Sequence, residues 1–562
     1  MSENERQSGA GQRPMPVAKH LAIVLWTLGV REAWGVCGRE IVPMWSALLE
    51  SEGTPWEIAT RHARHENGAG FAAIGSWMQT DRPTAIFATT GPGLTNVITS
   101  LETARATGAK FILLSPVTPA VERGRLGIQA TGPGGYANAD LNTPGRIFDL
   151  VATIESADQL TTLGGPLASG FAGVGGFSAH LALPTTLQPA MTDAEPALPA
   201  HRRPAPGIAP TVADELVDLL ASEPFAVWLG WGARRYATAV RRLLDVTGAP
   251  AVCSPRGVGI ADRHPQFLGT TGNGSRASLA RDLVGYGVRR TLVLGSALGE
   301  ATSGWDPALV PPEGFIHVDL NAGVFGRAYP QAPTLGVQGD TGQVLKALLT
   351  RSDRLVRRKP RTRRRSPAEK VERKLGVVHP IDLMSAIQRI LVDGSDMPII
   401  ADASSAMFWA VRHLSFPSPN RFFVEGHFGA MGQAGAVVVG AASGRGGSAA
   451  AICGDGSLHM QDEINTAVRY GIRAIWIVLN DGGLGIVRAG MRLNNRPLHD
   501  GDYPPTDFAA VARDKGAKGT RVKCARDLDA ALQQAVEARD PFLVDVLIDP
   551  TAVPPIEARA KR

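Results

Sequence analysis

The chain has 562 residues, too many for one hydrophobic core, so its length alone predicts about three domains. No apolar run approaches the roughly 20 residues needed to cross a bilayer, and the polar start MSENERQSGAGQRPMP lacks the apolar core of a secretory signal, so we expect a cytoplasmic protein with no membrane partner. The four cysteines lie far apart without a CxxC pair, which fits a reducing compartment and no structural zinc.

We place the first domain at residues 16–192. Two apolar runs, TAIFATT (84–90) and KFILLSP (110–116), are typical of buried parallel strands. Between them, GPGLTNVITSLETARAT opens with a Gly-Pro-Gly turn and continues as a helix. Strands that alternate with helices in this way predict a doubly wound α/β domain.

The same alternation occurs twice more along the chain. A Pro-rich stretch ends the first domain, and a second domain follows at 205–350, with its strands predicted at 225–230, 290–295 and 315–320. We place a third domain at 376–552, with its strands predicted at 397–404, 448–456, 474–481 and 542–549. The predicted fold is therefore three doubly wound α/β domains.

A basic linker, residues 351–375, separates the second and third domains. The sequence pI is about 9.2, but residues 351–374 hold 12 Lys or Arg against 3 Asp or Glu. Without them the chain would carry 46 basic and 49 acidic residues. The excess charge therefore belongs to one segment, which we interpret as a solvated linker with no nucleic-acid partner; a tether to RNA or a membrane surface is the alternative.

The segment GDGSLHMQDEINTAVRYGIRAIWIVLND (454–481) has the strongest chemical signal. One predicted strand ends at Gly-Asp-Gly, a helix follows, and a second strand ends at Asn480 and Asp481. Parallel neighbouring strands bring both ends to one edge of a sheet, where open α/β sheets bind ligands. Carboxylate and amide oxygens there suit Mg²⁺ that bridges a diphosphate, and the glycines allow close approach to phosphate.

This segment resembles the thiamine diphosphate (ThDP) motif, which begins Gly-Asp-Gly and closes with Asn-Asn. Three further segments support the resemblance: RHENGAGFAAIGSW (64–77), ATTGPGLTNVITSLETA (88–104) and FGAMGQAGAVVVGAA (428–442). In this order they resemble the acetolactate synthase, benzoylformate decarboxylase and oxalyl-CoA decarboxylase group. The resemblance implies a pyrimidine-binding domain, a central domain and a diphosphate-binding domain, with ThDP and Mg²⁺ as cofactors.

The resemblance also assigns roles to individual residues. Glu66 matches the catalytic glutamate that hydrogen-bonds N1′ of the aminopyrimidine ring and so promotes proton loss from C2 of the thiazolium ring. Gly429 matches the residue whose carbonyl accepts from the 4′-amino group, and Met431 matches the apolar wedge that bends the cofactor. The other positions expected to bind the cofactor are Ser404, Ser405, Ala406, Gly454, Gly456, Ser457, Asn96 and Gly483.

The implied metal ligands are Asp455, Asp481 and the main-chain carbonyl of Gly483. Asp481 departs from the pattern, because the family has the second asparagine of Asn-Asn there. Aspartate is an acceptable Mg²⁺ ligand, but it adds a negative charge beside the diphosphate. The central domain of such enzymes binds FAD or ADP, or no cofactor. TGNGS (271–275) is too short for a nucleotide loop, and we interpret it as a turn.

The reaction implied is carbon–carbon bond formation between a 2-oxo acid donor and a carbonyl acceptor. Residues 113–145 lack the adjacent histidine pair of many aldehyde-releasing relatives, and Gln129 resembles a pocket glutamine of acetolactate synthases. Gly490 stands where those synthases carry a tryptophan, which argues against a strict acetolactate synthase. The alternatives are a 2-oxo acid decarboxylase, a carbon–carbon lyase, or an inactive scaffold or regulatory subunit.

Two further expectations concern assembly and substrate binding. The resemblance implies a homodimer or homotetramer, in which the first domain of one subunit faces the third domain of its partner. In GVCGRE (35–40), Arg39 follows a loop that borders the substrate pocket in relatives. Its guanidinium suits a carboxylate or phosphate, so we expect Arg39 to hold an anionic group of the substrate. The alternative is a solvent-exposed arginine, or one that forms an ion pair with Glu40 or with a partner subunit.

Overall fold

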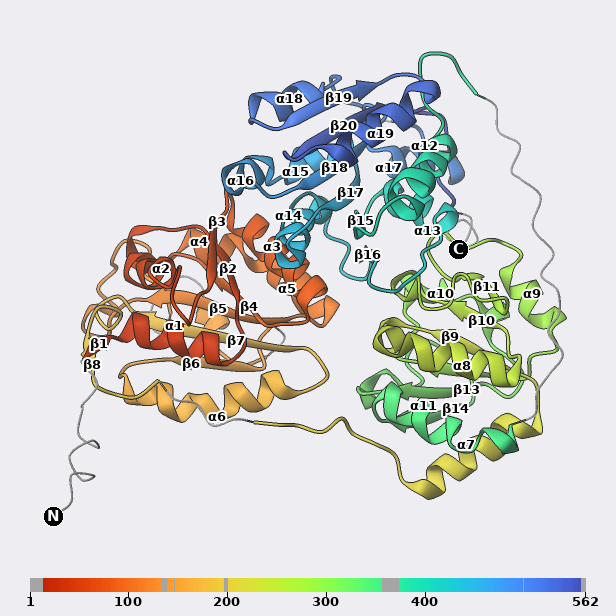
Figure 1. Cartoon of the computed structure of the whole chain (residues 1–562), viewed down its shortest axis with the longest axis horizontal. Coiled ribbons are helices and arrows are strands. Elements are labelled where there is room, and N and C mark those ends of the chain that lie inside the picture. The colour runs from red at the N-terminus through yellow and green to blue at the C-terminus, as the bar shows by residue number, and fades with distance from the viewer. Residues whose placement is uncertain are drawn as a thin grey trace. The chain divides into compact units, whose positions relative to one another are not determined.

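The computed structural model of the chain describes residues 14–132, 139–145, 147–196, 201–355, 373–498 and 500–556. The chain separates into two compact units, Met1–Pro204 and Ala205–Arg562 (Figure 1). Within the described residues, no helix is long and apolar enough to cross a membrane. Most of the basic linker, 356–372, lies outside the described residues.

The first unit is built on a six-stranded sheet in the order β3-β2-β4-β5-β7-β6, and all its pairs are parallel. The strands are β2 Glu32–Gly35, β3 Ala59–His62, β4 Thr84–Phe87, β5 Lys110–Val117, β6 Leu150–Thr153 and β7 Phe177–Pro184. The helices are α1 Val17–Thr27, α2 Val42–Leu49, α3 Glu66–Thr80, α4 Pro92–Asn96, α5 Ile98–Thr107 and α6 Asp158–Ala172, with short 3₁₀ turns at Arg39–Ile41, Ala120–Glu122 and Ala139–Asn142. A two-stranded antiparallel ribbon pairs β1 Met15–Pro16 with β8 Met191–Thr192.

Helices cover both faces of this sheet, which explains why its strands are apolar on both sides. One face packs against α1, α2 and α6, while α3 contacts α5 and the strands β2 and β4 (Figure 1). Every residue of β5 is buried, as expected for a central strand.

The second unit contains two further parallel six-stranded sheets. The central one has the order β11-β10-β9-β12-β13-β14. Its strands are β9 Phe225–Leu229, β10 Ala251–Cys253, β11 Phe267–Thr270, β12 Arg290–Leu294, β13 Phe315–Asp319 and β14 Thr334–Gln338. Its helices are α7 Pro210–Ser222, α8 Ala237–Thr247, α9 Leu279–Gly285, α10 Glu300–Ser303 and α11 Thr341–Leu349; α9 packs on the face opposite α7, α8 and α11.

The last sheet has the order β16-β15-β17-β18-β20-β19. Its strands are β15 Ile399–Ala401, β16 Phe422–Val424, β17 Ala449–Gly454, β18 Ala474–Asn480, β19 Lys518–Val522 and β20 Phe542–Leu547. Its helices are α12 Pro380–Ile387, α13 Ser405–His413, α14 Gln433–Arg445, α15 Asp455–Met460, α16 Ile464–Tyr470, α17 Gly485–Leu493, α18 Phe508–Asp514 and α19 Leu528–Glu537. One contiguous apolar core runs through the central and last sheets, which explains why they form one unit.

The three parallel sheets confirm the predicted fold class, and one local expectation was wrong. The segment between β17 and β18 was expected to hold one helix, but it holds two, α15 and α16, interrupted at 461–463. Gln461 is extended, and its carbonyl lies against Gly435 of α14, where a Cβ would come within 2.3 Å of that oxygen. The break thus lies where the chain packs closely against α14.

Candidate active site

Four neighbouring strands of the last sheet end directly before an acidic residue. Strands β16, β15, β17 and β18 lie side by side and are followed by Glu425, Asp402, Asp455 and Asp481. Because all four strands are parallel, these carboxylates are placed along one edge of the sheet, the edge at which such sheets bind ligands. The four carboxylates differ in their hydrogen-bond partners. These partners show which carboxylates hold the protein's own loops and helices together and which could bind a metal ion.

Asp455 is 2% exposed and accepts hydrogen bonds from three main-chain N–H groups. Its Oδ1 accepts from Gly456 at 2.8 Å, and its Oδ2 accepts from Gly482 at 2.8 Å and from Gly483 at 3.2 Å. Burial raises its pKa despite these bonds. Asp455 therefore ties the start of α15 to the loop after β18.

The side chains of Asn480 and Asp481 have different surroundings. Asn480 donates from Nδ2 to Asp545 Oδ1 at 2.9 Å and to the Thr506 carbonyl at 3.0 Å. Asp481 has a side chain that is 10% exposed, and Asp455 is close enough to raise its pKa by repulsion. The Asn480 side chain thus bonds to β20 and to the segment before α18. Asp481 is the residue of the pair whose carboxylate lies near Asp455.

The loop after β18 carries a buried ion pair. Arg488 Nη2 lies 2.6 Å from Asp481 Oδ2, and Arg488 Nη1 contacts Asp502. Burial, followed by repulsion from Asp455, raises the pKa of Asp481 to about 6, while Arg488 acts in the opposite direction. Tyr503 lies beside Asp455, and burial and the two carboxylates raise its pKa.

These residues fit a divalent cation. Two buried carboxylates with raised pKa values repel each other, and a cation between them relieves that repulsion. The third expected ligand, the Gly483 carbonyl, accepts a 3.0 Å hydrogen bond from Gly485 N. Neither here nor elsewhere in the described residues does a group of three or more His, Cys, Asp or Glu side chains form a metal site, so the donor set combines two carboxylates with a main-chain carbonyl. The hard-oxygen donor set suits Mg²⁺, with remaining positions for phosphate and water.

Asp402 is a residue of this edge that sequence reasoning missed. Its carboxylate is fully buried and accepts from Gly432 N at 3.2 Å, Ala434 N at 2.9 Å and Ser457 Oγ at 2.6 Å. Burial raises its pKa. It thus joins the end of β15 to the starts of α14 and α15. Its position directly after a strand, like that of Asp455, was the signal that could have identified it.

The residues expected to surround a diphosphate lie beside Asp402. Ser404 caps α13 by accepting from Ala406 N at 3.3 Å, and Ser405 is the first residue of that helix. At Gly454 a Cβ would lie 3.6 Å from Ser404 Oγ. At Gly456 a Cβ would come within 3.1 Å of Leu484 and 3.2 Å of the Tyr503 hydroxyl, so a side chain would crowd this edge. Short residues therefore line it.

Glu425, the second missed residue, organises the loop that leads to Met431. Its side chain is 3% exposed and accepts from the main-chain N–H groups of His427 at 2.7 Å and Gly429 at 3.0 Å. Gly429 has φ +73°, a left-handed conformation that favours glycine. Met431 is partly buried just before α14. The loop thus has a fixed shape next to the sheet edge.

In the first unit, Glu66 and Asn96 contact each other. Glu66 is the first residue of α3 and is 8% exposed, and Asn96 ends α4 and donates from Nδ2 to Glu66 Oε2 at 3.1 Å. A Cβ at Gly93 would lie 3.3 Å from Glu66 Oε1, so the glycine leaves room at that oxygen. The carboxyl group is thus held at a helix N-terminus.

The two expected substrate residues are exposed in this unit. Arg39 has a side chain that is 94% exposed and lies 3.4 Å from Glu40 Oε1, the ion pair that the sequence offered as the alternative. Gln129 is exposed, has φ +56°, and accepts from Thr90 Oγ1 at 3.2 Å. Their roles in binding substrate stay predictions.

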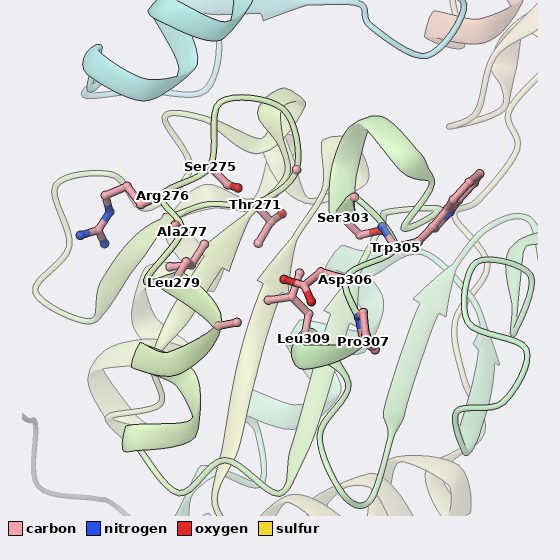
Figure 2. A pocket seen from close by; sticks show the side chains of 13 residues that line it. Thr271, Ser275, Arg276, Ala277, Leu279, Ser303, Trp305, Asp306, Pro307 and Leu309 are labelled. Carbon is pink, nitrogen blue, oxygen red and sulfur yellow. The ribbon is translucent and has the colours of Figure 1, made fainter. Parts of the chain in front are cut away.

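The central domain holds a separate pocket of about 330 Å³ (Figure 2). Arg276, Trp305 and Asp306 are among the residues that line it. TGNGS, at its rim, forms a turn as predicted, because Ser275 N donates to the Gly272 carbonyl at 3.0 Å. The pocket itself was not foreseen, and FAD or ADP in this domain stays a prediction.

Comparisons with known proteins agree with this architecture. Three family models for thiamine pyrophosphate enzymes match the chain: the N-terminal TPP binding domain at residues 15–133, the central domain at 214–348 and the C-terminal TPP binding domain at 402–546. The chain is 29% identical to "Putative acetolactate synthase large subunit IlvB2" of Mycobacterium tuberculosis, over 95% of this chain and 98% of that protein. It is 25% identical to the acetolactate synthase isozyme 1 large subunit of Escherichia coli, over 93% and 92%.

A solved structure shares the fold. The thiamine diphosphate-dependent 4-hydroxybenzoylformate decarboxylase of Rhodococcus jostii superposes with a TM-score of 0.81 at 20% identity, over 95% of this chain and 99% of that chain. The fold and the three family matches together define a thiamine diphosphate-dependent enzyme. The chain belongs to the thiamine pyrophosphate enzymes, as its motifs predicted, and resembles acetolactate synthase large subunits.

Proposed function

We propose that the protein is a ThDP- and Mg²⁺-dependent carboligase that joins a 2-oxo acid donor to a carbonyl acceptor. The observation that carries the cofactor assignment is the pair Asp455 and Asp481, each directly after one of two adjacent parallel strands, with Asn480 bonded elsewhere. The similarity to acetolactate synthase large subunits supports carboligation.

The chain's own residues supply binding and positioning. When bound, ThDP supplies the carbanion chemistry that makes and breaks a bond next to a carbonyl. Asp455, Asp481 and the Gly483 carbonyl hold Mg²⁺; Ser404, Ser457 and nearby main-chain groups surround the diphosphate; Glu66 holds a proton at the pyrimidine ring. The proposal includes a homodimer or homotetramer, which the family resemblance implies, and a cytoplasmic location, which rests on the cysteine spacing and the polar N-terminus.

A cofactor titration followed by a product screen tests the proposal. Purified protein is titrated with ThDP and Mg²⁺, and then incubated with a panel of 2-oxo acids and aldehydes whose products are identified by mass spectrometry. The proposal predicts saturable ThDP binding that requires Mg²⁺ and products with a new carbon–carbon bond. Release of free aldehydes alone would indicate a decarboxylase, and binding without any turnover would indicate a scaffold.

A further inference from the structure

Arg488 contacts Asp481, the candidate metal ligand, at two points and also contacts Asp502. It lies on α17 and is 7% exposed. Its Nη2 pairs with Asp481 Oδ2 at 2.6 Å and also donates to the Asp481 carbonyl at 3.1 Å, while Nη1 contacts Asp502. The guanidinium fork therefore binds both the side chain and the main chain of the residue expected to hold the metal.

The orientation of Asp481 depends on a glycine. A Cβ at Gly485, the first residue of α17, would lie 2.2 Å from Asp481 Oδ2. Any residue with a side chain at position 485 would therefore displace that oxygen. A second segment reinforces the arrangement, because Leu484 N donates to the Gly501 carbonyl at 2.8 Å and Tyr503 N donates to the Gly482 carbonyl at 3.2 Å. The loop after β18 is thus held from two sides.

Charge explains why such a pair is needed. Asp481 occupies the position at which the ThDP motif has an uncharged asparagine, and it lies close to the buried carboxylate of Asp455. Two carboxylates beside an anionic diphosphate repel one another strongly where water is scarce. A guanidinium within 2.6 Å of one carboxylate oxygen offsets that added charge locally.

We infer that Arg488 is a positioning residue that makes Asp481 usable as the metal ligand. It neutralises Asp481 through Oδ2 and leaves Oδ1 as the oxygen that would hold the metal, so the Asp481–Arg488 pair takes the place of the neutral asparagine. This inference rests on the proposed function, since it takes Mg²⁺ and ThDP as the occupants of the site. Arg488 should then strengthen Mg²⁺ and ThDP binding when residue 481 is an aspartate. It should have much less effect when residue 481 is an asparagine.

A double-mutant cycle tests this dependence. The affinity of the full-length protein for ThDP at saturating Mg²⁺, and for Mg²⁺ at saturating ThDP, is measured by calorimetry for the wild type, Arg488→Met, Asp481→Asn and the double variant. Arg488→Met should weaken ThDP binding about tenfold or more, and the double variant should recover to within about threefold of the wild type. Arg488→Lys, which keeps the charge, should fall between the wild type and Arg488→Met.

Matched controls separate this role from a general effect on folding. Arg445, a partly buried arginine of this domain, pairs with the exposed Asp396 at 2.9 Å, so Arg445→Met should leave both affinities unchanged. Circular dichroism and thermal unfolding check that every variant is folded. If Arg488→Met and the double variant bind equally weakly, or if Arg488→Met binds like the wild type, the inference is wrong. If the wild type itself binds no ThDP with Mg²⁺, the proposed function fails instead.

Discussion

Asn96 donates a 3.1 Å hydrogen bond to Glu66, and this bond fixes one oxygen of the carboxyl group to which the family resemblance assigns catalysis. Glu66 starts one helix and Asn96 ends another, so the contact depends on how α3 and α4 pack together. Because the amide donates to Oε2, the other oxygen, Oε1, stays near Gly93, where a side chain would crowd it. The pair therefore presents one defined carboxyl oxygen.

Replacing Glu66 by glutamine should remove activity while keeping the cofactor. An amide cannot share a proton with a ring nitrogen as a carboxylic acid does, so we expect kcat to fall about 10²- to 10⁴-fold. The affinity for ThDP should stay within about threefold of the wild type, because the residues proposed to bind the diphosphate and metal belong to another domain. Steady-state kinetics and calorimetry measure the two quantities.

Glu102, on α5 of the same domain, provides the matched control. Glu102→Gln makes the same chemical change without touching Asn96 and should retain wild-type kcat. A Glu66→Gln variant that turns over substrate at nearly the wild-type rate would show that Glu66 is not the catalytic carboxyl group.

Asn96→Ala tests whether Asn96 acts through Glu66. Loss of the amide donor leaves the Glu66 carboxyl group free to rotate, and we expect kcat to fall between about tenfold and a hundredfold. Added to Glu66→Gln, the same change should cost little more, because residues that act as one unit are not additive. Equal effects of Asn96→Ala in both backgrounds would indicate that Asn96 contributes separately.

Asp402→Asn should destabilise the second unit. Asp402 accepts three hydrogen bonds in a fully buried place. In the asparagine variant the amide N–H groups would face Gly432 N or Ala434 N, which can only donate, and only the Ser457 hydroxyl could accept from them. We expect a loss of about 2 kcal/mol in the free energy of unfolding, measured by urea denaturation. Asp396, whose side chain is 88% exposed, serves as control, and Asp396→Asn should cost less than about 1 kcal/mol. Equal losses for both variants would show that the hydrogen bonds of Asp402 contribute no more to the free energy of unfolding than the exposed ion pair of Asp396.

Arg39→Ala tests the expected contact with an anionic substrate. The side chain is 94% exposed and its ion pair with Glu40 is open to water, so the change should alter stability by less than about 1 kcal/mol. If Arg39 binds a substrate anion, KM for acidic substrates should rise about tenfold or more, while KM for neutral substrates stays nearly constant. An equal change for both substrate classes would exclude that role.

The sequence predicted the sheet edge because its signals are local. Asp455 and Asp481 each follow an apolar strand, and parallel topology alone places such residues together. The same rule, applied to the ends of β15 and β16, would have found Asp402 and Glu425, but no motif drew attention to them. What those two carboxylates do depends on N–H donors in later loops, which a strand pattern does not specify.

Side-chain orientation was the part that the sequence could not predict. Asn480 and Asp481 are adjacent and chemically similar, yet one bonds to Asp545 and the other to Arg488. That choice depends on the pleat of β18 and on the space left by Gly485, and both follow from packing and not from spacing. The break between α15 and α16 likewise lies at a close contact, with Gly435 of α14, which the spacing of apolar residues does not specify.

His180 is a buried histidine of β7 whose surroundings require the neutral ring. It is fully buried, and its Nδ1 lies 2.7 Å from the Leu141 carbonyl, which can only accept, so Nδ1 carries the hydrogen. Nε2 then accepts from Ser115 Oγ at 2.8 Å. Burial lowers the pKa of His180 to about 4, from an ordinary value of 6.5.

Acid should therefore destabilise the first unit through His180. Below pH 6.5 the unfolded chain binds a proton at His180, whereas the folded protein binds it only near pH 4. The free energy of unfolding therefore decreases as the pH falls from about 6.5 to about 4, and the whole contribution of the neutral ring to stability is present above pH 6.5. The shift corresponds to about 3 kcal/mol between neutral pH and about pH 4. Urea unfolding across this range should show a smaller loss for His180→Gln, even though that variant is less stable at neutral pH because the packing on Phe148 is lost. His201→Gln, at an exposed position, should follow the wild type. An acid dependence in His180→Gln as steep as in the wild type would assign the effect to other groups.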